Sequence, residues 1–171
     1  MDAIARDEIP VFDLESFGAD YARLGAALGR AARDTGFFCV TRHGIDAALL
    51  SQVFAQSSRF FSQNSTDKSA LSIKHAGNNR GYVALGEERL DSAKPGDIKE
   101  AFNIGWDLPP DHPEVVAGKP FRGLNVWPFA ESFPDFRATM LMYFNVCHHL
   151  GMQLHRALAH DLGVADRKSV V

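Results

Sequence analysis

The sequence predicts an α+β fold, in which helices outweigh a few short strands. Three segments space their apolar residues three or four positions apart, as one face of a helix requires: 20–35, 46–61 and 134–162. Short segments between and before them are rich in β-branched and aromatic residues, which is typical of strands: 9–14, 37–41, 82–85 and 98–108. The chain of 171 residues is long enough to bury a core of its own.

The first predicted helix lies between two β-rich segments. Its apolar face carries Tyr21, Leu24, Leu28, Ala31 and Thr35. Gly36 follows it, and a glycine readily takes the positive φ that ends a helix. The strand 37–41 is then predicted to be buried, and Asp46 is placed to cap a second helix. We expect these two helices and the strands 9–14 and 37–41 to form one compact block.

The rest of the chain combines an irregular middle with one long helix. Five prolines fall within residues 109–128 and predict an extended connection, because proline fixes φ and lacks an N–H donor. The long helix begins at about Pro134 and ends before Gly163. Its apolar face carries Phe136, Met140, Tyr143, Cys147, Leu150, Leu154 and Leu158.

Composition excludes several classes of protein. The net charge of −3 gives no reason to expect nucleic acid or an anionic membrane as a partner. No apolar run reaches the roughly 18–20 residues that span a bilayer, and the first ten residues do not resemble a signal peptide. Cys39 and Cys147 lie in apolar patterns, which predicts buried thiols in a reducing cytoplasm. Thirteen phenylalanines predict an aromatic core.

The histidines raise the question of a metal site. A site for Fe(II) needs two imidazoles and one carboxylate on one face of the ion. His43, in "GFFCVTRHGI", has no acidic residue two positions away, so we expect a turn histidine that bonds the backbone. His112 and Glu114 have that spacing but lie in the proline-rich connection, and His155 or His160 would have to complete the site. We expect no catalytic residue and no metal ligand in this chain. The alternative is a metalloenzyme built on His112 and Glu114.

Several pieces of the sequence, in order, resemble one family. They are "IPVFDL", "GFFCVTRHGI", "SSRFFSQNSTDKSAL", "NNRGYVALGEERLDSAKPGDIKEAFNIG", "LNVWP" and "YFNVCHHLGMQLHRALAHDLGV". Together they resemble the N-terminal region of the isopenicillin N synthase-like, 2-oxoglutarate- and Fe(II)-dependent dioxygenases, from about residue 8 to 164. One departure is Arg42, which stands where the family usually has asparagine.

The resemblance implies the first half of such an enzyme. The family's fold is a double-stranded β-helix, or jelly roll, wrapped by helices. Its iron ligands and its 2-oxoglutarate-binding Arg-x-Ser pair follow the long helix. Residues 1–165 would then be an incomplete enzyme that binds neither Fe(II) nor 2-oxoglutarate alone and lacks its C-terminal jelly roll. The full-length form would oxidise a small molecule and release succinate and CO2. The alternative from another class is a non-catalytic module that binds a partner.

The loop "RGYVALGEE" (80–88) supplies the candidate substrate-binding residues. In the resembling family this loop reaches toward the mouth of the active site. Glu88, Arg89 and Leu90 are therefore candidates, with Tyr82 nearby, and a merely solvated loop is the alternative. Residues 81–102 are also similar to ethylene-forming enzyme-like proteins. The last six residues, "DRKSVV" (166–171), break the family pattern, and we expect them to be a non-native tail.

Overall fold

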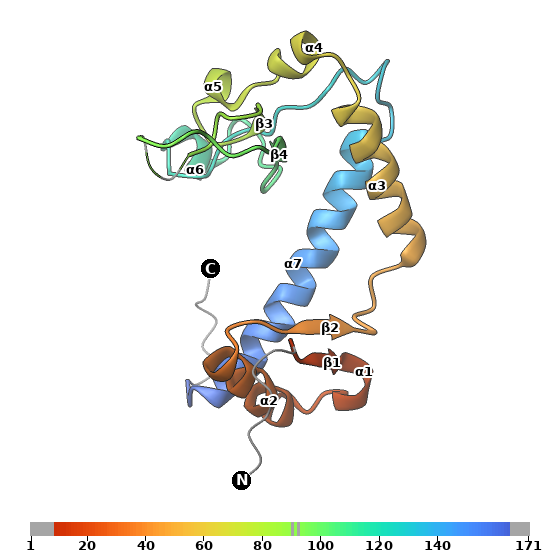
Figure 1. Ribbon diagram of the computed structural model, residues 1–171, viewed down its shortest axis with the longest axis vertical. Coiled ribbons are helices and arrows are strands. Elements are labelled where there is room, and N and C mark those ends of the chain that lie inside the picture. The colour runs from red at the N-terminus through yellow and green to blue at the C-terminus, as the bar shows by residue number, and fades with distance from the viewer. Residues whose placement is uncertain (1–8, 90, 92, 165–171) are drawn as a thin grey trace. The chain divides into compact units, whose positions relative to one another are not determined.

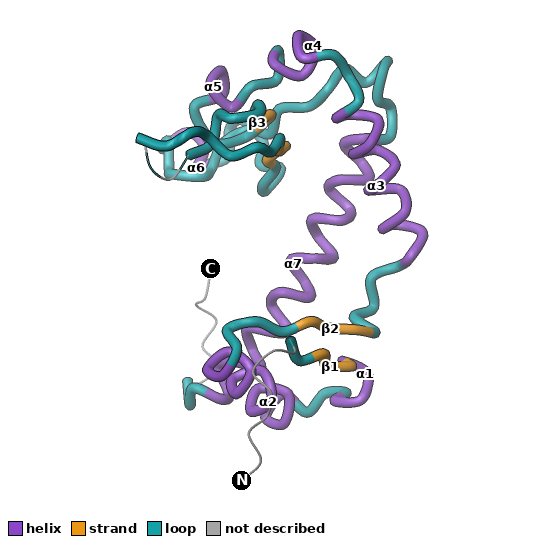
Figure 2. Tube along the Cα trace, in the orientation of Figure 1, coloured by secondary structure: helices purple, strands orange, loops and turns teal. Residues whose placement is uncertain are grey.

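The computed structural model describes residues 9–89, 91 and 93–164, and it divides into two compact units (Figure 1). The first unit comprises residues 1–46 and 145–171, and the second comprises residues 47–144. Helices dominate the described residues, and the strands form two short pairs (Figure 2). The long helix α7 (Phe136–Asp161) contributes residues to both units. The predicted α+β fold class is confirmed.

The first unit packs a small parallel sheet and a helix against the last part of α7. Strand β1 (Val11–Asp13) pairs with β2 (Cys39–Thr41), and the short helix α1 (Leu14–Phe17) leads to α2 (Tyr21–Asp34). The core of this unit consists of Leu24, Leu28 and Ala157, surrounded by partly buried Phe12, Leu14, Phe17, Tyr21, Phe38, Leu154 and Leu158.

Helix α2 begins and ends close to where its sequence predicts. The carboxylate of Asp20 accepts a hydrogen bond from the backbone N–H of Arg23 at 3.0 Å, which caps the helix. At the other end, Gly36 has φ of 77° and donates its N–H to the carbonyl of Ala31 at 3.0 Å. The apolar face predicted for this helix is the face that carries its buried leucines.

Two glycines allow α2 and α7 to approach closely within the first unit. A Cβ added at Gly25 would collide with the backbone carbonyl of Ala157, and one added at Gly29 would collide with the Asp161 carboxylate. The same carboxylate forms an ion pair with Arg33 at 2.6 Å. The spacing of four residues places both glycines on one face of α2, so the helix backbones meet there.

Replacing Gly25 with alanine should destabilise the chain by about 1–3 kcal/mol, because the added methyl group collides with rigid backbone. The collision outweighs the higher helix propensity of alanine. The matched control is Gly151→Ala in α7. An added Cβ has no neighbour within 4 Å there, so this substitution is expected to be neutral or stabilising. Denaturant unfolding followed by circular dichroism compares the two. A stabilised Gly25→Ala variant would contradict the close helix contact.

The second unit is built around an aromatic core. It contains the helices α3 (Ala47–Phe61), α4 (Ser65–Ser69), α5 (Ile73–Ala76) and α6 (Pro113–Val116). Strand β3 (Gly81–Val83) pairs in the antiparallel direction with β4 (Ala101–Asn103). The buried core residues are Phe60, Tyr82, Phe133, Phe136 and Met140. The expected aromatic core is confirmed, and Phe60 lies at its centre with no exposed surface.

Three predictions, about a strand, the cysteines and the first two helices, are wrong. Strand β2 begins only at Cys39, and its residues alternate between half-buried and exposed, because within the described residues it pairs with β1 alone and has one covered face. The Cys39 thiol is therefore exposed and Cys147 is only partly buried. The elements of the expected compact block are divided between the units, since α3 belongs to the second unit while α2 and both strands belong to the first.

The middle of the chain is also more helical and less extended than predicted. The strand expected over 98–108 shortens to β4, and the proline-rich connection contains the single turn α6. The side chain of His112 caps this turn and Pro113 occupies its first position, where a missing N–H costs nothing. Short capped turns of this kind have no apolar periodicity that a sequence pattern could reveal.

Arg42 departs from the family pattern at a position where the backbone has φ of 46°. Asparagine takes this left-handed conformation more readily than arginine does. The Nε of Arg42 donates to Asp13 at 2.7 Å, and its guanidinium also approaches Glu15 at 3.4 Å. These contacts help to hold Arg42 in its less favourable backbone conformation.

Candidate functional site

The loop that follows β3 is held in one conformation by its own hydrogen bonds. The backbone N–H of Ala84 donates to the Glu87 carboxylate at 2.7 Å, and the N–H of Glu87 donates back to the Ala84 carbonyl at 3.0 Å. Two further backbone bonds join Gly86 and Glu88 to Asp97 at 2.9 and 2.7 Å. Lys74 forms an ion pair with Glu87 at 2.5 Å and lowers the pKa of that carboxyl. The loop is therefore a fixed support for the residues that follow it.

Glu88 and Arg89 project from this support as exposed side chains. Glu88 forms an ion pair with Lys99 at 2.7 Å, across the loop. Arg89 lines a hollow of about 540 Å³, together with His75, Lys74 and Glu87. The candidate Leu90 lies outside the described residues. The structure thus brings one carboxylate and one guanidinium of the predicted set to the surface, where each can contact a ligand.

Tyr82 has a different environment from the other candidates. Its side chain is buried in the aromatic core, and its hydroxyl donates to the carboxylate of Glu100. Burial, followed by the hydrogen bond to Glu100, raises the pKa of Tyr82 to about 12. The phenol therefore stays protonated and is already engaged within the protein.

Lys68 and Glu100 complete a polar cluster around Tyr82 that the sequence pattern did not reveal. The Nζ of Lys68 donates to Glu100 at 2.6 Å and lies 5.6 Å from the centroid of the Tyr82 ring. Hydrogen bonds from Lys68 and then from Tyr82 lower the pKa of the Glu100 carboxyl. The cluster joins α4, β3 and the residue before β4, and so fixes the base of the candidate loop. In the sequence, the only indication of this cluster is that Glu100, a charged residue, directly precedes β4.

The hollow beside Arg89 has a positive charge balance. The charges of Lys74 and Glu87 cancel, because the two side chains form an ion pair. Arg89 and His75 remain as exposed donors on its wall. Such a surface can hydrogen-bond a carboxylate or another polar group of a small molecule.

Several histidines bond or stack on other groups of the protein. The Nδ1 of His43 accepts the backbone N–H of Ile45 at 3.1 Å, which confirms the predicted turn histidine. The Nδ1 of His112 accepts the N–H of Glu114 at 3.2 Å. On α7, His155 contacts the carbonyl of Gly151 at 2.7 Å, and the ring of His160 stacks on Tyr21.

Within residues 9–89, 91 and 93–164, no three His, Cys, Asp or Glu side chains come together as a metal site would require. The Glu114 carboxylate instead bonds Lys119 at 2.8 Å and Arg122 at 2.9 Å. None of the helices in the same residues has the length and apolar character that crossing a membrane requires.

Comparison with known proteins gives a consistent result. The family model for the N-terminal domain of non-haem dioxygenase in morphine synthesis matches residues 9–130. Kihadalactone A synthase of Citrus sinensis is 32% identical over 92% of this chain and 48% of the relative. Isopenicillin N synthase of Amycolatopsis lactamdurans is 30% identical, over 94% of this chain and 49% of the relative.

Solved structures agree with the sequence comparison. A 2OG-Fe(II) oxygenase family protein of Caulobacter crescentus superposes with a TM-score of 0.73 at 27% identity, over 91% of this chain and 49% of the other. A full-length Neurospora crassa protein in complex with alpha-KG superposes with a TM-score of 0.72 at 28% identity, over 92% and 48%. The chain spans about half the length of the curated relatives it matches. It belongs to the N-terminal domain family of the isopenicillin N synthase-like, 2-oxoglutarate- and Fe(II)-dependent dioxygenases.

Proposed function

We propose that the chain supplies the N-terminal region of a 2-oxoglutarate- and Fe(II)-dependent oxygenase. The observation that carries the proposal is the extent of the match, which covers 92% of this chain but 48% of Kihadalactone A synthase. The full-length form oxidises a small molecule with O2 and releases succinate and CO2. Bound Fe(II) and 2-oxoglutarate supply that oxidation, and their ligands come from the half that this chain does not match. The free thiols Cys39 and Cys147 suit the reducing cytoplasm as its compartment.

In this enzyme the loop after β3 contacts the primary substrate. Glu88 and Arg89 offer an acceptor and a donor on a loop that hydrogen bonds hold in place, and Leu90 follows them. Tyr82 acts as a positioning residue, because its hydroxyl bonds Glu100 beneath the loop. The similarity over residues 81–102 favours an ethylene-forming subtype, which ethylene in the headspace of the assay would reveal.

The isolated chain should form no succinate when it is incubated with Fe(II), 2-oxoglutarate and ascorbate. A chimera of residues 1–164 joined to the C-terminal half of the Caulobacter relative should form succinate above its metal-free blank. In that chimera, Arg89→Gln should raise the KM of an acidic substrate about tenfold, while the control Lys94→Gln should not. A folded chimera that makes no succinate would contradict the proposal. Succinate from the isolated chain, lost on His112→Ala, would instead favour a site on His112 and Glu114.

A second candidate function is a non-catalytic module that binds a protein partner. The second unit exposes several large apolar side chains, which a partner could cover: Phe54, Ile98, Val116 and Phe129 are 74%, 93%, 73% and 79% exposed. Stable binding of the separately expressed C-terminal half without succinate formation would support this candidate. Succinate formation by the mixture would support the oxygenase.

A further inference from the structure

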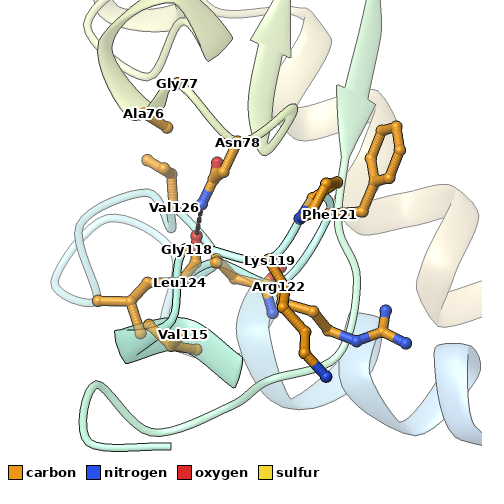
Figure 3. Close-up of a pocket in the computed structure, with 13 residues that line it drawn as sticks. Ala76, Gly77, Asn78, Val115, Gly118, Lys119, Phe121, Arg122, Leu124 and Val126 are labelled. Atoms are coloured by element: carbon orange, nitrogen blue, oxygen red, sulfur yellow. Dashed lines mark hydrogen bonds between the residues drawn. The ribbon is translucent and has the colours of Figure 1, made fainter. Parts of the chain in front are cut away.

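A second hollow, of about 650 Å³, lies in the same unit between residues 76–78 and the loop 115–126 that begins in α6 (Figure 3). It shares no lining residue with the hollow beside Arg89. The side-chain amide of Asn78 donates to the carbonyl of Leu124 at 3.1 Å and joins the two segments. This hollow is therefore a separate feature of the loop 115–126, which the oxygenase proposal does not use.

The hollow has an apolar side and a cationic side. Val115 and Leu124 lie on one side in Figure 3, while the side chains of Lys119 and Arg122 extend toward the other. A ligand that suits both sides needs an apolar body and an anionic end.

The cationic side carries more positive charge than its carboxylate neutralises. The Glu114 carboxylate accepts from Lys119 Nζ at 2.8 Å and from Arg122 Nε at 2.9 Å. One negative charge is thus shared between two cations. Because Arg122 uses its Nε for Glu114, the two terminal amino groups of its guanidinium remain suited to a second carboxylate.

Arg80 adds a buried charge next to the same loop. Its side chain donates to the backbone carbonyl of Phe121 at 2.8 Å, and its Nε has no hydrogen-bond partner among the described residues. Arg80 is only 7% exposed, and burial together with the nearby charge of Arg122 lowers its pKa. A buried cation whose hydrogen bonds go to carbonyl groups favours an anion close by.

We propose that this hollow binds a small organic carboxylate with an apolar body. The carboxylate lies on the terminal amino groups of Arg122, near Lys119, and the body packs against Val115 and Leu124. The buried charge of Arg80 strengthens the attraction for the anion. The site belongs to this chain alone and does not depend on the oxygenase proposal.

Amide chemical shifts of the whole 171-residue chain test the proposal in a titration with 3-phenylpropionate. Its neutral counterpart 3-phenylpropanamide keeps the same apolar body. We expect saturable shifts at residues 76–78 and 115–126 and about tenfold tighter binding of the carboxylate. Equal binding of the two compounds, or shifts that gather at residues 84–89, would overturn the proposal. This comparison uses the unmodified chain, so it does not depend on the folding of a variant.

Variants then test the charges. Arg122→Gln should weaken binding of 3-phenylpropionate about tenfold. Glu114→Gln should strengthen it roughly threefold, because both cations are released from their carboxylate. Arg156→Gln, an exposed arginine on α7, is the matched control and should leave binding unchanged. Weaker binding by Glu114→Gln, or unchanged binding by a folded Arg122→Gln variant, would contradict the assignment.

Discussion

Replacing Phe60 with alanine is expected to lower the free energy of unfolding by about 3–5 kcal/mol. The Phe60 ring is fully buried at the centre of the aromatic core of the second unit. Its centroid lies 4.8 Å from that of Phe102 and 5.5 Å from that of Phe136. Removing the ring therefore leaves a cavity lined by other rings, which cannot all move to fill it.

Phe54→Ala on the same helix is the matched control. The Phe54 side chain is 74% exposed, so its loss should change the free energy of unfolding by less than about 0.5 kcal/mol. Denaturant unfolding followed by circular dichroism measures both variants. If the two substitutions destabilise the chain equally, Phe60 is not the centre of the core.

Lys68→Met is expected to destabilise the chain by about 3 kcal/mol. The Lys68 side chain is only 8% exposed, and its ammonium bonds both Glu100 and the carbonyl of Phe61. Methionine preserves much of the apolar stem but leaves the Glu100 carboxylate without its cation. The matched control is Lys99→Met, whose exposed ion pair with Glu88 should contribute much less to stability.

The pH dependence of unfolding tests the same cluster. Lys68 lowers the pKa of Glu100 in the folded chain, so the unfolded chain takes up that proton first as the pH falls. The stabilisation that the ionised Glu100 carboxylate contributes is fully present above the ordinary carboxyl pKa of about 4.3. It is lost as the pH falls through the lower pKa that Glu100 has in the folded chain. The loss should be shallower in Lys68→Met than in the unmodified chain. Identical profiles would show that Glu100 does not depend on Lys68.

Local chemistry made several features predictable from the sequence. The period of the apolar residues predicted α2, and Gly36 predicted its end, because a left-handed turn involves only neighbouring residues. The spacing around His43 indicated a turn histidine for the same reason. The order of motifs along the chain indicated the family, which the comparisons confirm.

Features of the candidate site depended on residues distant in the sequence. Tyr82 was predicted from its place beside a loop, but its hydroxyl bonds Glu100 in the neighbouring segment. Lys68 reaches the same carboxylate from α4, and nothing in the pattern around residue 68 indicates that contact. Whether the exposed residues Glu88 and Arg89 contact a substrate remains the proposal that the chimera tests.

The sequence by itself determined the three long helices and the family, because each depends on contacts within a few residues or on the order of motifs. The tertiary structure alone decided which residues are buried and which charges are paired. Cys39 is exposed although it lies in an apolar run, because its strand has one partner strand among the described residues and one covered face. Gly25 and Gly29 look unfavourable in a helix until α7 is placed against them. Burial and pairing depend on what other segments bring to the same place, and a local pattern does not contain that information.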